Sequence, residues 1–376
     1  MILFIWIMFG TIFMLGIING ITPYFSRRSS QFGVSIPVEY QDDPFIKKQQ
    51  RFFLSMNVSL SFILGLPILY AMRLDVSEQI AQFISFYLLF ALVAFMGIVG
   101  LLFLKIRKNI IEFKSTIPKE IVADESHDIV VDTTYRQRRL IVPSYFIIIS
   151  NLIIILAVVG ITLINYEQMP DRIITNWDIN MKPSVTVAKS YTSALALPVM
   201  QLFMMGTMYV ANLSFQKAKQ KVDPRNPAVS IEKNRAFRYA WSIYGLVMSI
   251  LLQLLLGGLQ LIMIFDWMNK VNFPLMIIIF VVLTIGGTLI LSIKYGQGGE
   301  RLKLKDSKGD KIETVAGYDD DISWKLGVIY FNSKDPSIWV EKRFGVGNTM
   351  NMARWQSWAF LIAILAIPLL IGILFN

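Results

Sequence analysis

The chain has 376 residues, of which 55% are hydrophobic and only 16% charged, and its formal net charge is +10. Soluble domains carry about 25% charged residues, so the composition indicates a membrane protein. Cysteine is absent and the one histidine is His127. This excludes disulfides and thiol catalysis, and it leaves too few ligands for an ordinary zinc or iron centre. We therefore expect no cofactor.

Eight apolar stretches are long enough to cross a bilayer as helices. They are Ile2–Ile21, Phe52–Met72, Ile80–Leu104, Ile141–Ile164, Ser193–Phe215, Tyr239–Phe265, Phe273–Ile293 and Trp358–Phe375. All 36 Lys and Arg and all 26 Asp and Glu lie outside them. Since a charge near the bilayer centre costs about 2.5–3.5 kcal/mol, this pattern predicts an all-α integral membrane protein with eight transmembrane helices.

The basic residues also predict an orientation. The four odd-numbered connections between the stretches hold 31 of the 36 Lys and Arg, clustered near the ends of the helices. The positive-inside rule places these connections in the cytoplasm. We therefore expect a bacterial plasma-membrane protein with both termini extracellular, and a first helix that is retained because no basic leader or cleavage site accompanies it.

The predicted organisation follows from this orientation. Residues 1–104 hold helices one to three, and 105–140 form a cytoplasmic loop with a short helix. Residues 141–293 hold helices four to seven with an extracellular loop at 165–192, and 358–376 form the last helix. Residues 294–357 alternate polar and apolar side chains between turn signals, which predicts a small β-rich cytoplasmic module. Its expected hairpins pair 301–305 with 311–315, and 324–331 with 337–343.

No ionisable residue lies inside the predicted helices, but buried amides do. Gln253 and Gln260 are seven residues apart, so they share one helix face. Two interpretations stay open for these amides: hydrogen bonding between helices, or a polar path for a transported substrate. The pairs Gly97/Gly100, Gly257/Gly258 and Gly286/Gly287 predict close helix approach.

The extracellular loop is the one outer segment large enough to recognise a partner. It is either a packed cap over the helix ends or a docking surface for a peptide. The candidate partner-binding residues there are Pro170, Asp171, Arg172, Asn176, Trp177 and Lys189. In the cytoplasmic module they are Trp324, Tyr330, Asn332, Asp335, Pro336, Lys342 and Arg343.

Three segments carry a family resemblance. Residues 32–37 (FGVSIP) resemble the opening of a group of Gram-positive bacterial membrane proteins. Residues 170–190 resemble a domain of unknown function also found in Sdp-type toxin-immunity and signalling membrane proteins, although Asn176 stands where that domain usually has His and Met181 near its usual Gly. Residues 324–351 are similar to a second uncharacterised domain.

The resemblance implies a role rather than a reaction. Sdp-type relatives resist a toxic peptide and recruit a repressor to the membrane. We therefore expect a non-enzymatic protein of peptide immunity or membrane signalling, whose partners are the lipid bilayer and an extracellular peptide or a cytoplasmic regulatory protein. A component of a small-molecule or peptide transporter is the alternative. Nucleic acid is not expected as a partner, because each basic cluster borders an apolar helix, where anionic lipid accounts for it.

Overall fold

The computed structural model describes residues 2–71, 78–118, 121, 139–177, 183–220, 222–223, 226–265, 267, 271–303 and 320–374. Its long helices are α1 (Ile2–Phe25), α2 (Pro44–Tyr70), α3 (Glu78–Thr116), α5 (Tyr145–Ile164), α6 (Tyr191–Lys217), α7 (Pro227–Ile264), α8 (Phe273–Tyr295) and α9 (Trp355–Leu374). All eight are long and apolar enough to cross a membrane. This confirms the number and order of the predicted apolar helices.

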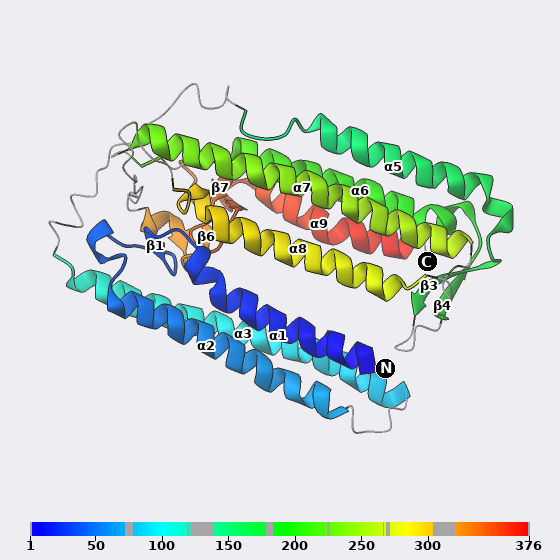
Figure 1. Ribbon diagram of the computed structural model, residues 1–376, viewed down its shortest axis with the longest axis horizontal. Helices are drawn as coiled ribbons and strands as arrows, with labels where there is room; N and C mark the ends of the chain where they lie inside the picture. The colour runs from blue at the N-terminus through cyan, green and yellow to red at the C-terminus, as the bar shows by residue number, and fades with distance from the viewer. Residues whose placement is uncertain are drawn as a thin grey trace.

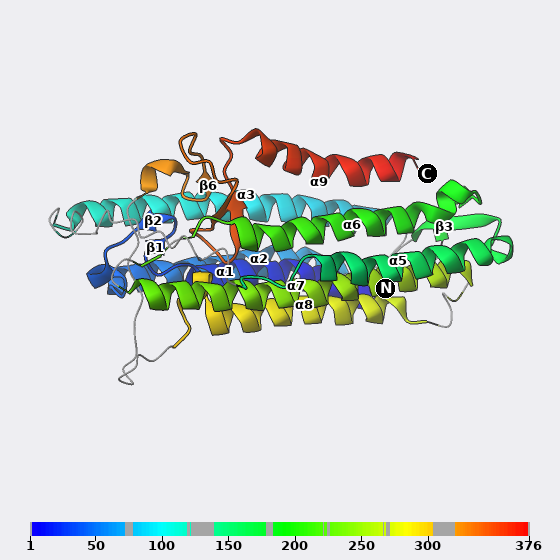
Figure 2. The same cartoon turned by 90° about the horizontal axis from the view of Figure 1, so that it is seen from above.

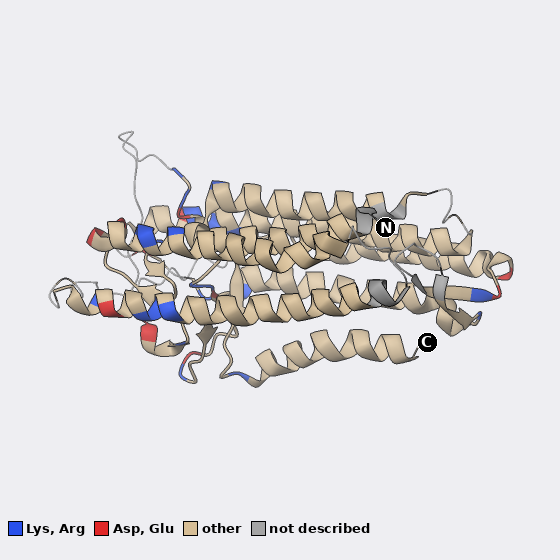
Figure 3. Cartoon of the chain, turned by 90° about the horizontal axis from the view of Figure 1, so that it is seen from below, with Lys and Arg blue, Asp and Glu red and all other residues tan. Residues whose placement is uncertain are grey.

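The helices lie alongside one another, and both chain ends are at the same end of the molecule as β3 (Arg172–Trp177) and β4 (Pro183–Ala188) (Figure 1). We call this the hairpin end. The opposite end, which we call the module end, holds the short strands near residues 30–35 and 324–350. Charged residues are grouped at the two ends and are absent from the middle of the described helices (Figure 3). Such a surface is suited to lipid along its length and to water at both ends.

Three helices extend by eight or more residues past their predicted boundaries at the module end, and the first is α2, which begins at Pro44 rather than at Phe52. α3 continues beyond Leu104 to Thr116, and α7 begins at Pro227 rather than at Tyr239. The extension of α3 is stabilised by packing, because Ile106 and Ile110 are fully buried in a cluster with other apolar side chains. The predicted short helix of the 105–140 loop is therefore a direct continuation of α3.

The helices form two groups. In the first, α1 packs along α2 and α2 along α3; in the second, α5, α6 and α7 pack together, with α8 against α7 and α9 against α6. The two groups lie beside each other in Figure 1, and they overlap in Figure 2, which looks along the line that joins them. Their buried apolar clusters are separate among the described residues: those of the first group draw on α1–α3 and the nearby loops, and those of the second on α5–α7 and the loops at their ends.

The expected close approaches at glycine are confirmed in part. A Cβ on Gly257 would lie 2.9 Å from Val158, and one on Gly287 would lie 2.5 Å from the Tyr244 ring. Helix packing there requires glycine. The expectation is wrong for the pair on α3, because Gly97 and Gly100 are exposed and face open space. Gly286 is likewise open.

The buried amides confirm the prediction of interhelical hydrogen bonds. The side-chain amides of Gln201 and Gln253 each donate to the other's backbone carbonyl at 3.0 Å. Gln260 donates to the Ala194 carbonyl at 2.9 Å, and Asn151 donates to Ser249 Oγ at 3.2 Å. These contacts join α5, α6 and α7 through groups that lipid cannot satisfy.

At the hairpin end, β3 and β4 pair antiparallel. Met169 and Ile173 are buried against Ala194 and Ile264, at the ends of α6 and α7. The Lys189 ammonium donates to the Met169 carbonyl at 3.0 Å. One side of the hairpin therefore caps the second helix group, as one of the two interpretations of this loop requires.

The module consists of two small hairpins, and the predicted strand pairing within it is wrong. β5 (Trp324–Lys325) pairs with β6 (Ile329–Tyr330), and β7 (Trp339–Glu341) pairs with β8 (Asn348–Met350). The physical reason is turn chemistry. Leu326 and Gly327 both have positive φ, so the chain reverses inside the segment that was expected to be one strand. Most of the other predicted hairpin, 301–305 with 311–315, lies outside the described residues.

A third tight hairpin precedes α2, and its tip meets the tip of the β5–β6 hairpin. β1 (Ser30–Gln31) and β2 (Val34–Ser35) flank a turn at Phe32 and Gly33, both with positive φ. A Cβ on Gly33 would lie 2.2 Å from the Gly327 carbonyl oxygen. Two of the segments that carry the family resemblance are therefore in backbone contact.

We predict that Gly33→Ala destabilises the protein, because alanine at φ +74° costs about 1–2 kcal/mol and its methyl group clashes with the Gly327 backbone. Gly97→Ala is the matched control. It lies in a helix with open space around it, so it should leave stability unchanged or raise it by about 0.5–1 kcal/mol. Thermal unfolding of the detergent-purified protein measures both, and equal melting temperatures for the two variants would contradict the prediction.

Candidate functional site

A buried carboxylate on strand β7 of the module joins the two helix groups. Glu341 accepts hydrogen bonds from Arg238 at 3.0 Å and from Asn234 at 2.7 Å, both on α7. Its other oxygen pairs with Arg27, which follows α1. The side chain of Glu341 is only 4% exposed. One negative charge is thus shared by arginines from both helix groups.

The charges around Glu341 alternate and extend outward. Arg27 lies 3.5 Å from Glu300, whose carboxylate also accepts from the backbone N–H of Arg28 at 2.9 Å. Burial would raise the pKa of Glu341, but Arg27 and Arg238 outweigh it and hold the pKa below its ordinary value. Glu341 is therefore a charged structural anchor and not a proton donor. We call Arg27, Arg238, Asn234 and Glu341 the charge junction.

Arg343 is the second buried ionic residue of the module. Its guanidinium pairs with Asp320 and Asp321, and it donates to the Gly33 carbonyl and to Ser35 Oγ at 3.0 Å each. Burial would lower the pKa of Arg343, but the two aspartates outweigh it and raise the pKa. Arg343 thus fixes the β1–β2 hairpin to the module.

α3 contributes two cations to the same place. Lys114 pairs with Asp321 at 3.0 Å, and Arg107 donates to the Gly33 carbonyl at 2.9 Å. Burial would raise the pKa of Asp321, but Arg343 and then Lys114 outweigh it and lower the pKa. Lys114 on α3 and Arg27, which follows α1, are therefore tied to residues 320–343 by charge-assisted bonds.

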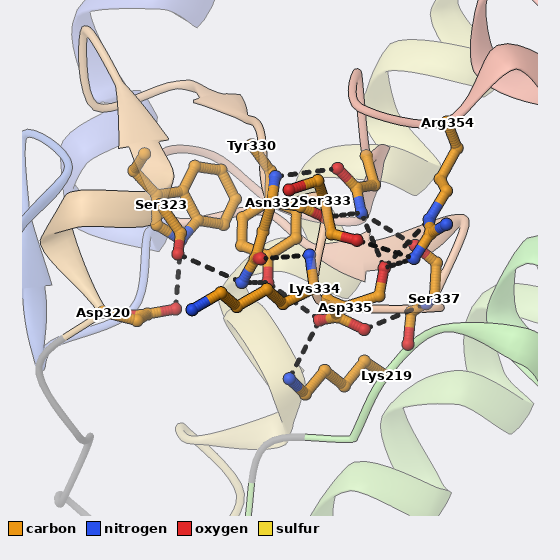
Figure 4. A network of polar contacts seen from close by, with 12 residues as sticks. Lys219, Asp320, Ser323, Tyr330, Asn332, Ser333, Lys334, Asp335, Ser337 and Arg354 are labelled. Carbon is orange, nitrogen blue, oxygen red and sulfur yellow. Dashed lines mark hydrogen bonds and ion pairs between the residues drawn. The ribbon is translucent and has the colours of Figure 1, made fainter.

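A third polar cluster has Asp335 at its centre (Figure 4). The carboxylate accepts from Lys219 at 2.9 Å, Tyr330 at 2.8 Å and the backbone N–H of Ser337 at 2.9 Å. Burial would raise the pKa of Asp335, but these hydrogen bonds lower it to about 2. Because Lys219 follows α6, the cluster fixes the module to the second helix group.

Asn351 stabilises the turn that precedes β7. Its Oδ1 accepts from the backbone N–H of Asn332 at 3.0 Å, and its Nδ2 donates to the carbonyl of Asn332 at 2.8 Å. Arg354 donates to the Asp335 carbonyl at 3.0 Å. The side chains of Asn351 and Arg354 thus form hydrogen bonds within the module.

The interior of the module has little space for a ligand. A cavity of about 30 Å³ lies between the charge junction and the β5–β6 hairpin, with Glu341, Arg343 and Tyr330 in its wall. It has room for a few water molecules at most. In the described parts of the chain, no group of three or more His, Asp or Glu side chains is placed to hold a metal ion.

The outer side of the module is apolar. Ile322 is 91% exposed and Phe331 is 48% exposed, and the apolar side chains of Leu326, Val328 and Ile329 between them are also exposed. We call the set Ile322, Leu326, Val328, Ile329 and Phe331 the apolar face. Asp321 contacts Lys114, which lies about 15 Å along α3 from Leu104 at 1.5 Å per residue. The Ile322 end of the apolar face is therefore beyond the apolar stretch of α3, while the hairpin tip at Gly327 lies beside Arg107, nearer to Leu104.

The structure divides the candidate residues of the module into two sets. Trp324, Tyr330, Asp335 and Arg343 are buried, and their contacts are within the chain. Asn332 is partly buried. Pro336 and Lys342 are exposed. The module thus holds most of these residues away from a partner.

The candidate residues of the hairpin end are more accessible. Pro170, Asp171 and Arg172 are exposed, while Lys189 is half-buried and lies 3.7 Å from Asp171. Asn176 and Trp177 lie on β3 opposite Val185 and Pro183. Their side chains, and residue Met181, lie outside the described part of the structure.

Local sequence patterns do not predict the charge junction. Arg27 and Arg238 belong to the basic clusters that were attributed to anionic lipid at the membrane edge, and Glu341 falls in the expected strand 337–343. Arg27 and Glu341 are 314 residues apart, and no local periodicity reports such a pairing. Glu341 is followed by Lys342 and Arg343, so its sequence neighbours resemble an ordinary charged loop and do not mark it as buried.

Comparison with known proteins gives one match. Residues 334–358 match a family of unknown function (DUF5808). This segment contains β7, β8 and Glu341, so the matched residues coincide with the part of the module that joins the helix groups. No curated protein and no solved structure matches the chain.

We predict that Glu341→Gln lowers the free energy of unfolding by about 3–5 kcal/mol, because it leaves Arg27 and Arg238 buried without their shared anion. Denaturant unfolding of the purified protein in detergent measures the change. The matched control is Glu112→Gln, which breaks the exposed Lys108–Glu112 pair on α3 and should cost about 0.5 kcal/mol or less. A small effect at position 341 would show that the junction does not stabilise the fold.

The lowered pKa of Asp335 predicts acid sensitivity. Its pKa is about 2 in the folded protein against an ordinary value of 3.8, so its stabilisation is complete above about pH 4. That stabilisation is lost as the pH falls from about 4 to about 2. Asp335→Asn should reduce the pH dependence of the melting temperature in this window, while Asp171→Asn, at a fully exposed carboxylate, should leave it unchanged. Identical pH profiles for Asp335→Asn and wild type would contradict this assignment.

Proposed function

We propose that the chain is a non-enzymatic, multi-pass protein of a Gram-positive bacterial plasma membrane that recruits a cytoplasmic protein in peptide-toxin immunity or signalling. In this proposal the module end faces the cytoplasm and both termini are outside. The observation that carries it is the apolar face. The buried polar side chains of the module form most of their bonds within the chain. Exposed apolar surface on such a small module is characteristic of protein–protein contact.

The position of the apolar face favours a protein over lipid as its partner. Ile322 lies beyond the apolar stretch of α3, next to the Lys114–Asp321 pair. Exposed Lys325 and Lys334 border the apolar side chains. The expected partner therefore presents an apolar patch with an acidic rim.

The resemblance to Sdp-type proteins supports the biological setting. Those relatives combine resistance to a peptide with recruitment at the membrane, and this chain has one small folded element at each end. The buried ions of the module have structural partners, and its cavity is too small for a substrate. Both features favour a binding protein over an enzyme.

Transport is the second candidate, and one observation favours it. The side-chain oxygens of Asn151, Gln201 and Gln253 are buried between α5, α6 and α7 without a hydrogen-bond partner in the described structure. Such oxygens line polar paths in transporters. Substrate-dependent flux in proteoliposomes would favour this candidate.

Single cysteines in this cysteine-free chain test the proposal. In intact cells, an impermeant thiol reagent should label Asp171→Cys but neither Lys108→Cys nor Phe331→Cys. In inverted vesicles, Lys108→Cys should react at once, while Phe331→Cys should react only after peripheral proteins are stripped, because the partner covers it. Positions 108 and 171 are highly exposed controls for the two ends.

Each result has a distinct consequence. Full labelling of Phe331→Cys in unstripped vesicles would contradict recruitment, and labelling of position 108 in intact cells would reverse the sidedness. In the physiological assay, Phe331→Asp should make cells as sensitive as a deletion strain to at least one membrane-active peptide. Equal sensitivity across a broad panel would exclude peptide immunity.

A further inference from the structure

An open cavity of about 420 Å³ lies at the module end, between α7 and the end of α8. It is separate from the charge junction and from the apolar face. Its lining is Arg139, Arg235, Ala236, Tyr239, Ala240, Ile243 and Tyr295. Two arginines and two tyrosines therefore surround a floor of small and apolar side chains.

The two arginines give the cavity the chemistry of an anion site. Arg139 is exposed, and Arg235 is partly buried beside Glu232, with hydrogen bonds of 2.6 and 2.9 Å. Both members of that pair are about 40% exposed, and such surface pairs are weak and readily exchanged. A guanidinium presents a planar fork of donors that matches two phosphate oxygens.

The depth of the cavity corresponds to the edge of a bilayer. Tyr239 is the first residue of the charge-free stretch of α7, and Tyr295 comes two residues after Ile293, the last apolar residue of α8. Tyrosine rings concentrate at this level because their rings are apolar and their hydroxyls are polar. The arginines lie on the aqueous side of that level and Ile243 on the apolar side.

An apolar track leads from the cavity along α7. Ile243 in the cavity wall, Val247 one turn later and Leu254 two turns beyond it share one face of the helix, and all three are exposed. A free phosphate ion or nucleotide gains nothing from such a track. An acyl chain would cover it.

We propose that this cavity is a binding site for an anionic phospholipid. The phosphate lies between Arg139 and Arg235, the tyrosines flank the glycerol region, and an acyl chain follows Ile243 and Val247 along α7. The assignment of the lipid to the cytoplasmic leaflet rests on the proposed function; the selectivity for anionic lipid does not, so the two fail independently.

Native mass spectrometry of the full chain in detergent tests the site. Phosphatidylglycerol should bind wild type more tightly than phosphatidylcholine does. Arg139→Gln/Arg235→Gln should weaken phosphatidylglycerol binding about thirtyfold, given the usual contribution of each basic residue near an anionic lipid. The matched control is Lys105→Gln/Lys108→Gln, which removes two exposed charges from α3 at the module end. It should leave this binding step unchanged.

A second variant tests the cavity without changing charge. Ala240→Phe fills the floor and should weaken phosphatidylglycerol binding while the protein remains monodisperse by size exclusion. Three results would overturn the proposal: unchanged binding in the arginine double variant, equal loss in the lysine control, or full competition by millimolar inorganic phosphate, which would indicate a free-phosphate site. Binding that is lost in both cavity variants but kept in the control supports it.

Discussion

The arrangement of the whole molecule depends on one buried anion. Glu341 is shared by Arg27 of the first helix group and by Arg238 and Asn234 of the second. A buried carboxylate is unfavourable unless it is paired and hydrogen-bonded, and each arginine here would be equally unfavourable without it. The interaction therefore requires β7 to lie between the two groups, and it sets their spacing at the module end.

The residues around Glu341 extend this role to the rest of the module. Trp339 packs against Phe360 of α9, Val340 contributes to the module core, and Arg343 holds the β1–β2 hairpin. Phe344 contacts aromatic rings of the first helix group. Five of the six positions from 339 to 344 thus contact the helices and hairpins of the module end, and they lie within the segment that matches the family of unknown function. The matched segment is therefore an architectural joint between the helices and hairpins of the module end.

The helices can be predicted from the sequence because lipid imposes a local rule. A charged residue inside a membrane-spanning stretch costs free energy whatever the rest of the chain does, so such stretches stand out as charge-free. The shared face of Gln253 and Gln260 could also be predicted, because their spacing of seven residues corresponds to two helical turns. The prediction of a small β-rich module is also confirmed, but the predicted pairing of its strands is wrong. Leu326 hides the turn signal, since Asn or Asp usually precedes the glycine there. The charge junction depends on contacts between distant segments, which no local pattern encodes.

The distribution of polar groups explains why such a protein has its specificity at the ends of its helices. In the described interior of the membrane-length helices, amide side chains bond to carbonyl and hydroxyl groups of neighbouring helices and so stabilise packing between α5, α6 and α7. The ions are placed at the module end, where the exposed ones are solvated and the buried ones are paired with opposite charges. Because the two helix groups have separate apolar cores, a change in the junction would alter their relative position more readily than a change within either group. A partner on the apolar face and a lipid beside α7 would then both act at the module end, where the charge junction joins the two groups.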